Sequence, residues 1–408
     1  MVAPVFFFFA VLSVIEDHTA VRSGCDSGAE VLTNLQAGTP VEIRFRLADG
    51  SDCFKIAAAV DGKQVLGYLP ASALSGLNSF EQARSSAASV DNVSALNPVA
   101  TQTRKAVART GDAKLDRAAQ LLEANQPAQA LELLEPAAQR HRNDPNVLLL
   151  AGLAAYRSDQ LRTALDYWKQ SLDLAPNQTL ERVYERVRRE EESDHSAEKL
   201  YGMHIALRYE DQALPSDTAR AILSTLDDDY AGISAQLGCS SEERIVAIVQ
   251  SRETYLRSTG AAEWSGGQYD GRIHIAWTEG AQLGSQTRRA LAHEMVHACL
   301  TSIPSGNSAW PAWLQEGLAQ KLSGDTLAPA TRDQLRQLAQ AHRLPRLEDL
   351  RQDWSRLSIE NARLAYNMAL AAADVLYDNY VSYGIRNVLS NPDNLTQVTA
   401  ELDKKLGL

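Results

Sequence analysis

The spacing of apolar and polar residues changes along the chain and divides it into regions of different expected structure. Residues 11–75 contain short alternating runs, such as 41–46 and 54–57, separated by turn residues, which is typical of half-buried strands. Residues 76–111 are rich in Ser, Ala, Asn and Thr and lack apolar periodicity, so we interpret them as a linker. Residues 112–195 then follow the helical period. We therefore expect a small all-β module, a linker and a helical module.

The remaining residues, 196–408, mix strand-like and helical patterns and are expected to form one further domain. The whole chain is therefore predicted to be a multidomain α+β protein. The elements expected in this last domain are strands at 203–209, 245–249 and 271–277, a helix over 216–237 and a long Ala-rich helix over 361–389.

The helical module contains an internal repeat, because the dipeptide Ala-Leu at 130–131 recurs at 164–165, 34 residues later. Together with the small residues of 151–156, Trp168 and Pro176, this spacing is similar to tetratricopeptide repeats. Two copies fall short of the three that normally form a stable stack, so neighbouring helices are expected to cap them. The resemblance allows either a surface that binds peptide or protein partners or a helical spacer packed on the last domain.

The charged run at 181–192 follows these repeats, and we interpret it as a solvated helix face.

The N-terminal β module resembles bacterial SH3-like domains in three segments, 20–24, 35–41 and 67–70. The resemblance implies a small barrel of the kind that binds cell-wall or peptide ligands in envelope proteins. The alternative is a barrel that only spaces or docks the rest of the chain.

Composition narrows the classes of partner. The 51 acidic and 40 basic side chains leave a net charge of −11, which disfavours nucleic acid because phosphate binding needs a basic face. The longest apolar run, 5–15, is too short to cross a bilayer. We interpret residues 1–10 as a signal peptide, although 11–15 can instead form a first strand. An exported protein of the bacterial envelope is therefore expected, with a cytoplasmic protein as the alternative.

Four cysteines, Cys25, Cys53, Cys239 and Cys299, allow two disulfides in an exported chain. Cys25 and Cys53 fall in the same small module and are the favoured pair. Cys299 lies two residues after His297, which turns it about 200° around a helix. We therefore interpret Cys299 as a buried structural residue and not as a metal ligand.

The strongest chemical signal is the sequence His-Glu-Met-Val-His at 293–297. Residues four apart lie on one face of a helix, so His293 and His297 can bind a single ion. Glu316 lies in an otherwise apolar run, where a carboxylate is costly to bury unless a cation meets it. Zinc takes nitrogen and carboxylate ligands and keeps an open position in catalytic sites. The pattern predicts His293, His297 and Glu316 as ligands of one Zn²⁺ per chain, with Glu294 as general base.

The alternative is an amphipathic helix whose histidines are satisfied by hydrogen bonds. The helix that carries the motif has N-cap candidates at 285–287, and a second helical run begins near Pro311 and stops at Gly324. His274 offers a further imidazole, but its place between two isoleucines favours an ordinary polar residue on a strand face.

The motif at 293–297 and Glu316 within Pro-Ala-Trp-Leu-Gln-Glu-Gly-Leu-Ala (311–319) resemble the gluzincin metallopeptidases. The spacing is similar to that of the aminopeptidase-N-like branch, and the sequence around Glu316 is similar to that of compact bacterial peptidase MA-like domains. The resemblance covers about residues 200–395. It implies a gluzincin fold, with the ligands and base named above.

The resemblance also implies residues around the reacting bond. The strand at 271–277, with Ile273 and Ile275, is expected to be the sheet edge that binds an extended substrate. Tyr366 is the candidate donor to the oxyanion, although packing explains it equally well. Gln320 stands where the family usually has an acid, and it is expected to accept a hydrogen bond from a ligand imidazole.

These observations predict a zinc metallopeptidase. The chain lacks the Gly-Ala-Met-Glu-Asn motif of exopeptidases, so we expect it to hydrolyse internal bonds of a peptide or protein substrate. One alternative is an inactive zinc-binding scaffold that binds partners through its SH3-like and tetratricopeptide modules. Another is a structural zinc site, which would require a fourth protein ligand.

Overall fold

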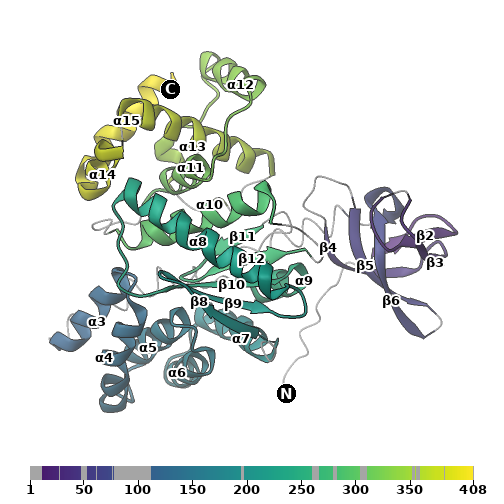
Figure 1. Cartoon of the computed structure of the whole chain (residues 1–408), viewed down its shortest axis with the longest axis horizontal. Coiled ribbons are helices and arrows are strands. Elements are labelled where there is room, and N and C mark those ends of the chain that lie inside the picture. Colours follow the sequence, from purple (N-terminus) through teal and green to yellow (C-terminus); the bar gives the residue numbers. More distant parts are fainter. Residues whose placement is uncertain are drawn as a thin grey trace.

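The structure, a computed structural model, describes residues 12–26, 28–46, 53–60, 62–75, 77, 112–193, 197–259, 266–278, 283–303, 310–351, 354, 359–380 and 382–407. These residues form a curled antiparallel sheet, a helical region and a second small sheet covered by helices (Figure 1). The expected mixture of α and β parts is therefore confirmed, and the family of each part stays a prediction. The expected signal peptide, 1–10, and nearly all of the expected linker, 76–111, lie outside the described residues.

Seven described strands form the N-terminal sheet, in the order β3-β2-β6-β5-β4-β1-β7, and neighbouring strands pair antiparallel. Val21, Ile56 and Leu69 are fully buried inside its curl. The expected pair Cys25–Cys53 is confirmed as a disulfide. The elements are β1 Leu12–Val14, β2 Thr19–Arg22, β3 Val31–Leu35, β4 Pro40–Arg46, β5 Cys53–Val60, β6 Lys63–Pro70, η1 Ala71–Ala73 and β7 Leu74–Ser75.

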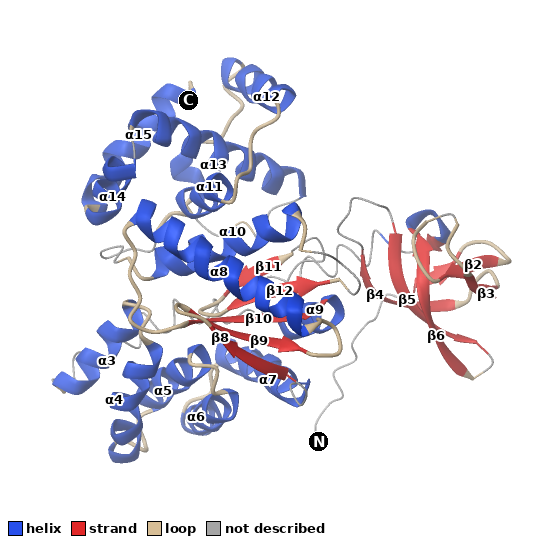
Figure 2. Ribbon diagram, in the orientation of Figure 1, coloured by secondary structure: helices blue, strands red, loops and turns tan. Residues whose placement is uncertain are grey.

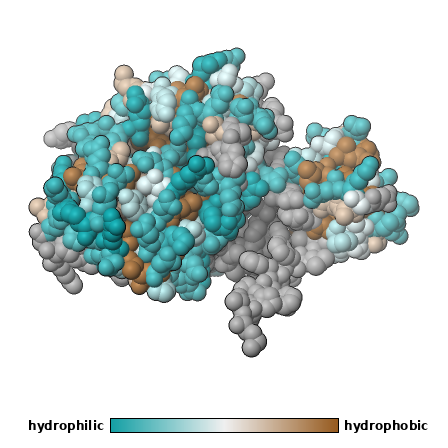
Figure 3. Space-filling model, turned by 90° about the horizontal axis from the view of Figure 1, so that it is seen from below, coloured by the Kyte–Doolittle hydropathy of each residue, from teal (hydrophilic) through white to brown (hydrophobic). Residues whose placement is uncertain are grey.

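The outer surface of this sheet carries apolar side chains. Seen from below, brown residues gather on the N-terminal sheet, whereas the rest of that face is mostly hydrophilic (Figure 3). Large exposed apolar side chains of this part include Val31, Leu32 and Leu66, each between 44% and 47% exposed.

The helical region consists of α3 Ala113–Glu123, α4 Pro127–Arg140, α5 Pro145–Arg157, α6 Leu161–Leu174 and α7 Gln178–Ser193. Its repeat has a physical basis, because Ala130 of α4 and Ala164 of α6 are both fully buried at the repeated position. Gly152 lies so close to Trp168 that an added Cβ would be 2.3 Å from the indole ring. Small residues therefore let α5 and α6 approach closely, and α7 packs against α6 as the expected neighbouring helix.

The interpretation of 181–192 as a solvated face is wrong for two of its residues. Arg186 and Glu190 of α7 are only 1% and 2% exposed. The reason is that α7 packs against the second sheet, where opposite charges meet Arg186 and Glu190. Periodicity alone cannot reveal such partners, because they come from distant parts of the chain.

The second sheet has five described strands in the order β11-β12-β10-β9-β8, in which β9, β10 and β12 are parallel and the two outer strands antiparallel. The helices α8 and α10 cover one face, and the helical region lies on the other (Figures 1 and 2). The strands are β8 Ala197–Tyr201, β9 Ile205–Glu210, β10 Ile245–Ser251, β11 Gly267–Tyr269 and β12 Ile273–Trp277; the helices among them are α8 Ser216–Leu237, α9 Arg252–Thr259 and α10 Ser285–Thr301.

The C-terminal helices pack on α10 from the side away from the sheet (Figure 2). The single long helix expected over 361–389 is wrong, because the chain forms two helices there. The first of them ends at Asn379, whose side-chain amide donates to the Val375 carbonyl. The elements are α11 Ala312–Leu322, α12 Pro329–Gln340, η3 Leu347–Leu350, α13 Ile359–Asn379, α14 Ser382–Ser390, η4 Pro392–Asn394 and α15 Leu395–Leu406.

A second disulfide joins Cys239, just after α8, to Cys299 in α10. Cys299 is buried, as expected, and the structure adds its partner 60 residues away in sequence. Among the described helices, none combines the length and apolar character that a membrane span requires.

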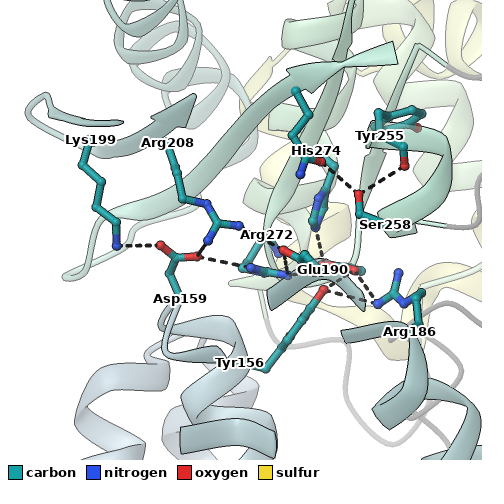
Figure 4. Close-up of polar contacts among 12 residues, drawn as sticks. Tyr156, Asp159, Arg186, Glu190, Lys199, Arg208, Tyr255, Ser258, Arg272 and His274 are labelled. Carbon is teal, nitrogen blue, oxygen red and sulfur yellow. Dashed lines mark hydrogen bonds and ion pairs between the residues drawn. The ribbon is translucent and has the colours of Figure 1, made fainter. Parts of the chain in front are cut away.

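Ion pairs and hydrogen bonds of charged side chains join the helical region to the second sheet. Glu190 of α7 accepts hydrogen bonds from Arg208 of β9 at 3.0 Å and from Arg272, which precedes β12, at 2.9 and 3.0 Å (Figure 4). Asp159, in the turn between α5 and α6, forms ion pairs with the same two arginines at 3.1 and 3.2 Å. Elsewhere Glu243, in the loop before β10, accepts from two backbone amides at the start of α4. The two parts therefore meet through a buried ionic network.

This network predicts that acid weakens the attachment of the helical region. Burial alone would raise the pKa of Glu190 and Asp159, but the adjacent arginines outweigh it and lower both below their ordinary values of 4.5 and 3.8. A carboxyl whose pKa is lower in the folded state stabilises the fold above its unfolded pKa, and this contribution is lost as the pH falls through the folded pKa. We expect the free energy of unfolding in urea to fall steadily below about pH 4.5.

The matched control is the variant Glu190→Gln, which has no carboxyl to protonate at this position. It should be less stable than the wild type at neutral pH and lose less stability on acidification. An equal loss in both proteins would show that Glu190 does not contribute to the acid sensitivity.

Candidate metal centre

The helix α10 carries the two histidines on one side and its apolar residues on the others. Leu291, Met295 and Val296 are fully buried against the second sheet and the neighbouring helices. The helix begins at Ser285, and its N-cap is Gly284 without a side-chain hydrogen bond, so the expected capping by 285–287 is wrong. Tertiary packing, and not a polar cap, therefore holds this helix.

The helix α11 brings Glu316 to α10. Its N-cap is Pro311, and the chain leaves it through Gly324, whose φ is +87°. Gly317 lies so close to α13 that an added Cβ would be 2.4 Å from the Ala369 carbonyl oxygen. A glycine directly after Glu316 thus permits the close approach of α11 and α13.

The structure brings His293, His297 and Glu316 together. One ligand atom from each lies within 4.8 Å of the others. The His293 Nε2 is 3.3 Å from Glu316 Oε2, and the His297 Nε2 is 3.6 Å from Glu316 Oε1. The two imidazole centroids are 5.0 Å apart. Three side chains with zinc-binding atoms therefore converge on one point between α10 and α11.

One atom of this triad tests whether a cation fits. The Glu316 Oε2 is buried and has no hydrogen-bond partner, because its approach to His293 lacks hydrogen-bond geometry. A buried carboxylate oxygen without a donor is costly. A cation between the three side chains would satisfy it, and two imidazoles with one carboxylate are ligands that zinc accepts. The residues therefore fit a metal ion.

The charges in the triad favour the same interpretation. Burial works to lower the pKa of His293, but the Glu316 carboxylate outweighs it and raises that pKa to about 9. Burial lowers the pKa of His297 to about 4, so its neutral form, which has the lone pair a metal needs, prevails at neutral pH. Burial works to raise the pKa of Glu316, but the adjacent His297 and His293 outweigh it and lower that pKa. The triad thus favours a positive charge beside Glu316, which is what a bound cation would supply.

Glu294 lies next to the triad without belonging to it. Its side chain is almost wholly buried, at 7% exposure, and burial raises its pKa to about 7. It lies directly against β11, since a Cβ added to Gly267 would be 2.8 Å from Glu294 Cγ and 2.9 Å from Oε1. A carboxyl with this pKa is suited to exchange protons near neutral pH.

Comparison with protein-family models, with curated protein sequences and with solved structures found no match to this chain. The candidate metal site therefore rests on the geometry of His293, His297 and Glu316.

The structure corrects the proposed substrate edge. The strand β12 pairs with β10 on one side and with β11 on the other, so Ile273 and Ile275 belong to an inner strand and are buried. The outer strand is β11, and it is the strand that contacts Glu294. Its residues, Gly267–Tyr269, have no apolar alternation, which is why the pattern missed it. The dipeptide Asp270-Gly271 before β12 is the hairpin signal that could have revealed it.

The structure also corrects the expected partner of Gln320. Its amide nitrogen donates to the carbonyls of Glu316 and Tyr366, at 3.1 and 3.0 Å. Among the described residues no hydrogen bond joins Gln320 to either ligand imidazole. The side chain therefore links α11 to α13.

Tyr366 and His274 complete the set of expected residues. The Tyr366 backbone carbonyl accepts a hydrogen bond from Gln320, which lies one turn after Glu316 in α11. The Tyr366 ring packs edge-on against Trp354, with 5.0 Å between the ring centroids. A role at the oxyanion thus stays a prediction. His274 is fully buried and its Nε2 lies 3.2 Å from Asp270 Oδ1, away from the triad's own residues. It is a structural residue of the sheet, as interpreted from the sequence.

Proposed function

We propose that this protein is a zinc-dependent metallopeptidase that hydrolyses internal peptide bonds. The observation that carries the proposal is the convergence of His293, His297 and Glu316 beside a buried fourth group, Glu294, which the triad does not use. When bound, zinc supplies Lewis acidity that polarises a carbonyl and makes water acidic near neutral pH.

The protein's own residues would then carry the proton. Glu294 accepts a proton from the attacking water, and the same carboxyl later donates it to the nitrogen of the leaving amine. Its burial supports this role, because a carboxyl whose pKa is about 7 can both accept and donate near neutral pH. The outer strand β11 lies against Glu294 and is placed to align an extended peptide beside it. Tyr366 remains the candidate donor to the oxyanion.

Two observations support a catalytic site over a structural one. The group of described His, Cys, Asp and Glu side chains that can bind one ion contains three ligands, as catalytic zinc sites do, whereas structural sites normally have four. Both cysteine pairs are engaged in disulfides, which removes thiolates as further ligands. The disulfides also suit an exported protein, because they persist in oxidising compartments.

The test combines zinc analysis with cleavage of a peptide library. We expect one zinc per chain, internal cleavage of peptides, loss of both on treatment with a chelator, and recovery of both on addition of Zn²⁺. Bound zinc without cleavage of any peptide would favour the scaffold, whose SH3-like and repeat modules bind protein or cell-wall partners. Absence of bound zinc in a folded protein would contradict both proposals.

A further inference from the structure

The turn between β11 and β12 is embedded in the helical region. The Asp270 carboxylate in this turn is completely buried. Its Oδ2 accepts a hydrogen bond from the Tyr156 hydroxyl of α5 at 2.7 Å and lies 3.4 Å from Nη2 of Arg186 in α7. Figure 4 shows Tyr156 and Arg186 directed from the helices toward the sheet. Two helices of the helical region thus bind one carboxylate of the hairpin.

Gly271, the next residue of the turn, also packs tightly against the helical region. Gly271 has a φ of +107°, which favours glycine, and an added Cβ would be 2.7 Å from Arg157 Cγ and Nε. Arg157 is the last residue of α5, and its guanidinium donates to the Leu122 carbonyl at the end of α3. The hairpin turn therefore lies directly on the helices, with no room for a side chain between them.

The same carboxylate also fixes the hairpin internally. Asp270 Oδ1 lies 3.2 Å from His274 Nε2 in β12 and accepts from the Arg272 backbone amide at 3.3 Å. Arg272 in turn stacks on the Tyr156 ring, with 3.8 Å between the guanidinium carbon and the ring centroid. Asp270 is thus the point at which the helices, the turn and the inner strand β12 are joined.

The other end of the hairpin contacts the metal centre. In β11 the residues Tyr269, Gln268 and Gly267 pair with Ile273, His274 and Ile275 of β12, and Gly267 lies against Glu294. Three residues of extended chain span about 10 Å, so the turn and Glu294 are connected by one short rigid segment. At the turn end, the Tyr269 hydroxyl also donates to Asn125 between α3 and α4, at 3.4 Å. The backbone beside Glu294 is therefore held from the helical region.

We propose that the helical region positions the strand β11 against Glu294, and that Tyr156 and Arg186 are positioning residues which act through Asp270. The proposal rests on the proposed peptidase function, in which Glu294 and the substrate meet beside β11. The helices 113–193 accordingly help to position the active site, in addition to any binding of partners.

The experiment uses Tyr156→Phe, which removes one hydroxyl and keeps the ring, together with Asp270→Asn and the double variant in the full chain. The control is Glu243→Gln, which weakens another contact between the helical region and the sheet domain without touching the hairpin. Hydrogen exchange of the amides at 267–269, zinc content, melting temperature, kcat and KM are measured for each. These readouts separate a loosened strand from a general loss of folding.

We expect Tyr156→Phe to raise exchange at 267–269 and to lower kcat/KM, each by about tenfold, since a buried carboxylate loses a donor. Zinc content should stay at one per chain, and Glu243→Gln should change neither exchange nor kcat/KM at this strand. Loss of the Tyr156 hydroxyl should lower kcat/KM by a smaller factor in the Asp270→Asn background, because its hydrogen-bond partner there is no longer charged.

Unchanged exchange at 267–269 in Tyr156→Phe, or an equal change in Glu243→Gln, would overturn the positioning role. A wild-type protein that binds zinc and cleaves no peptide would overturn the proposed function instead. In that case hydrogen exchange still decides whether the helices hold β11, so the two failures are distinguishable.

Discussion

Replacement of Glu294 by Gln is expected to lower kcat by about 10²–10⁴-fold while one zinc per chain stays bound. The amide has the shape of the carboxylate but cannot accept the proton of the attacking water. The three ligands are unchanged, so metal content should be unaffected. The measurement is steady-state cleavage of the best library peptide, with zinc analysis of the same preparation.

The matched control for this variant is Glu348→Gln, which makes the same chemical change at an exposed residue of η3 paired with Arg351. It should cleave at the wild-type rate. Full activity of Glu294→Gln would refute the role of Glu294 as base, and loss of zinc together with activity would place Glu294 among the ligands.

Replacement of Glu316 by Gln is expected to weaken zinc binding by more than the roughly 10–100-fold that loss of an outer hydrogen-bond partner costs. The variant loses the anionic ligand that lies 3.3 and 3.6 Å from the two imidazole nitrogens. Cleavage should fall in proportion to bound zinc and recover in part at high Zn²⁺. The measurement is zinc affinity by competition with a chelator of known affinity.

Gln320→Leu provides the sharpest comparison for Glu316→Gln, because it lies one turn further along the same helix. Gln320 donates hydrogen bonds to two backbone carbonyls, and among the described residues none joins it to either imidazole, so its loss should leave zinc affinity within a few-fold of wild type. A loss of 10–100-fold would show that Gln320 supports a ligand histidine after all. Unchanged affinity in Glu316→Gln would remove Glu316 from the ligand set.

The metal triad was predictable because most of its geometry is local. His293 and His297 share one face of any helix that contains them, and a glutamate in an apolar run such as that of Glu316 needs a positive partner. The strands β4 and β5 of the N-terminal sheet and the helix α8 were predictable for the same reason, since their periods are visible over a few residues. The families of the separate parts remain predictions.

Features that depend on distant partners could not be predicted. The pattern at 181–192 is that of an exposed helix, yet Arg186 and Glu190 are buried because oppositely charged groups of the second sheet meet them. In the same way, β11 is too short and polar to show a strand period. It is a strand because β12 pairs with it.

The sequence by itself determined which side chains can bind a metal and which glutamate is left over, because helix geometry and residue chemistry are local properties. Only the tertiary structure decided what surrounds them: that β11 and not β12 is the outer strand at Glu294, and that Cys299 pairs with Cys239. It also decided that the helices 113–193 hold the hairpin turn at Asp270. The physical reason is that burial, strand order and ion pairing depend on contacts between residues far apart in the chain, which local periodicity does not encode.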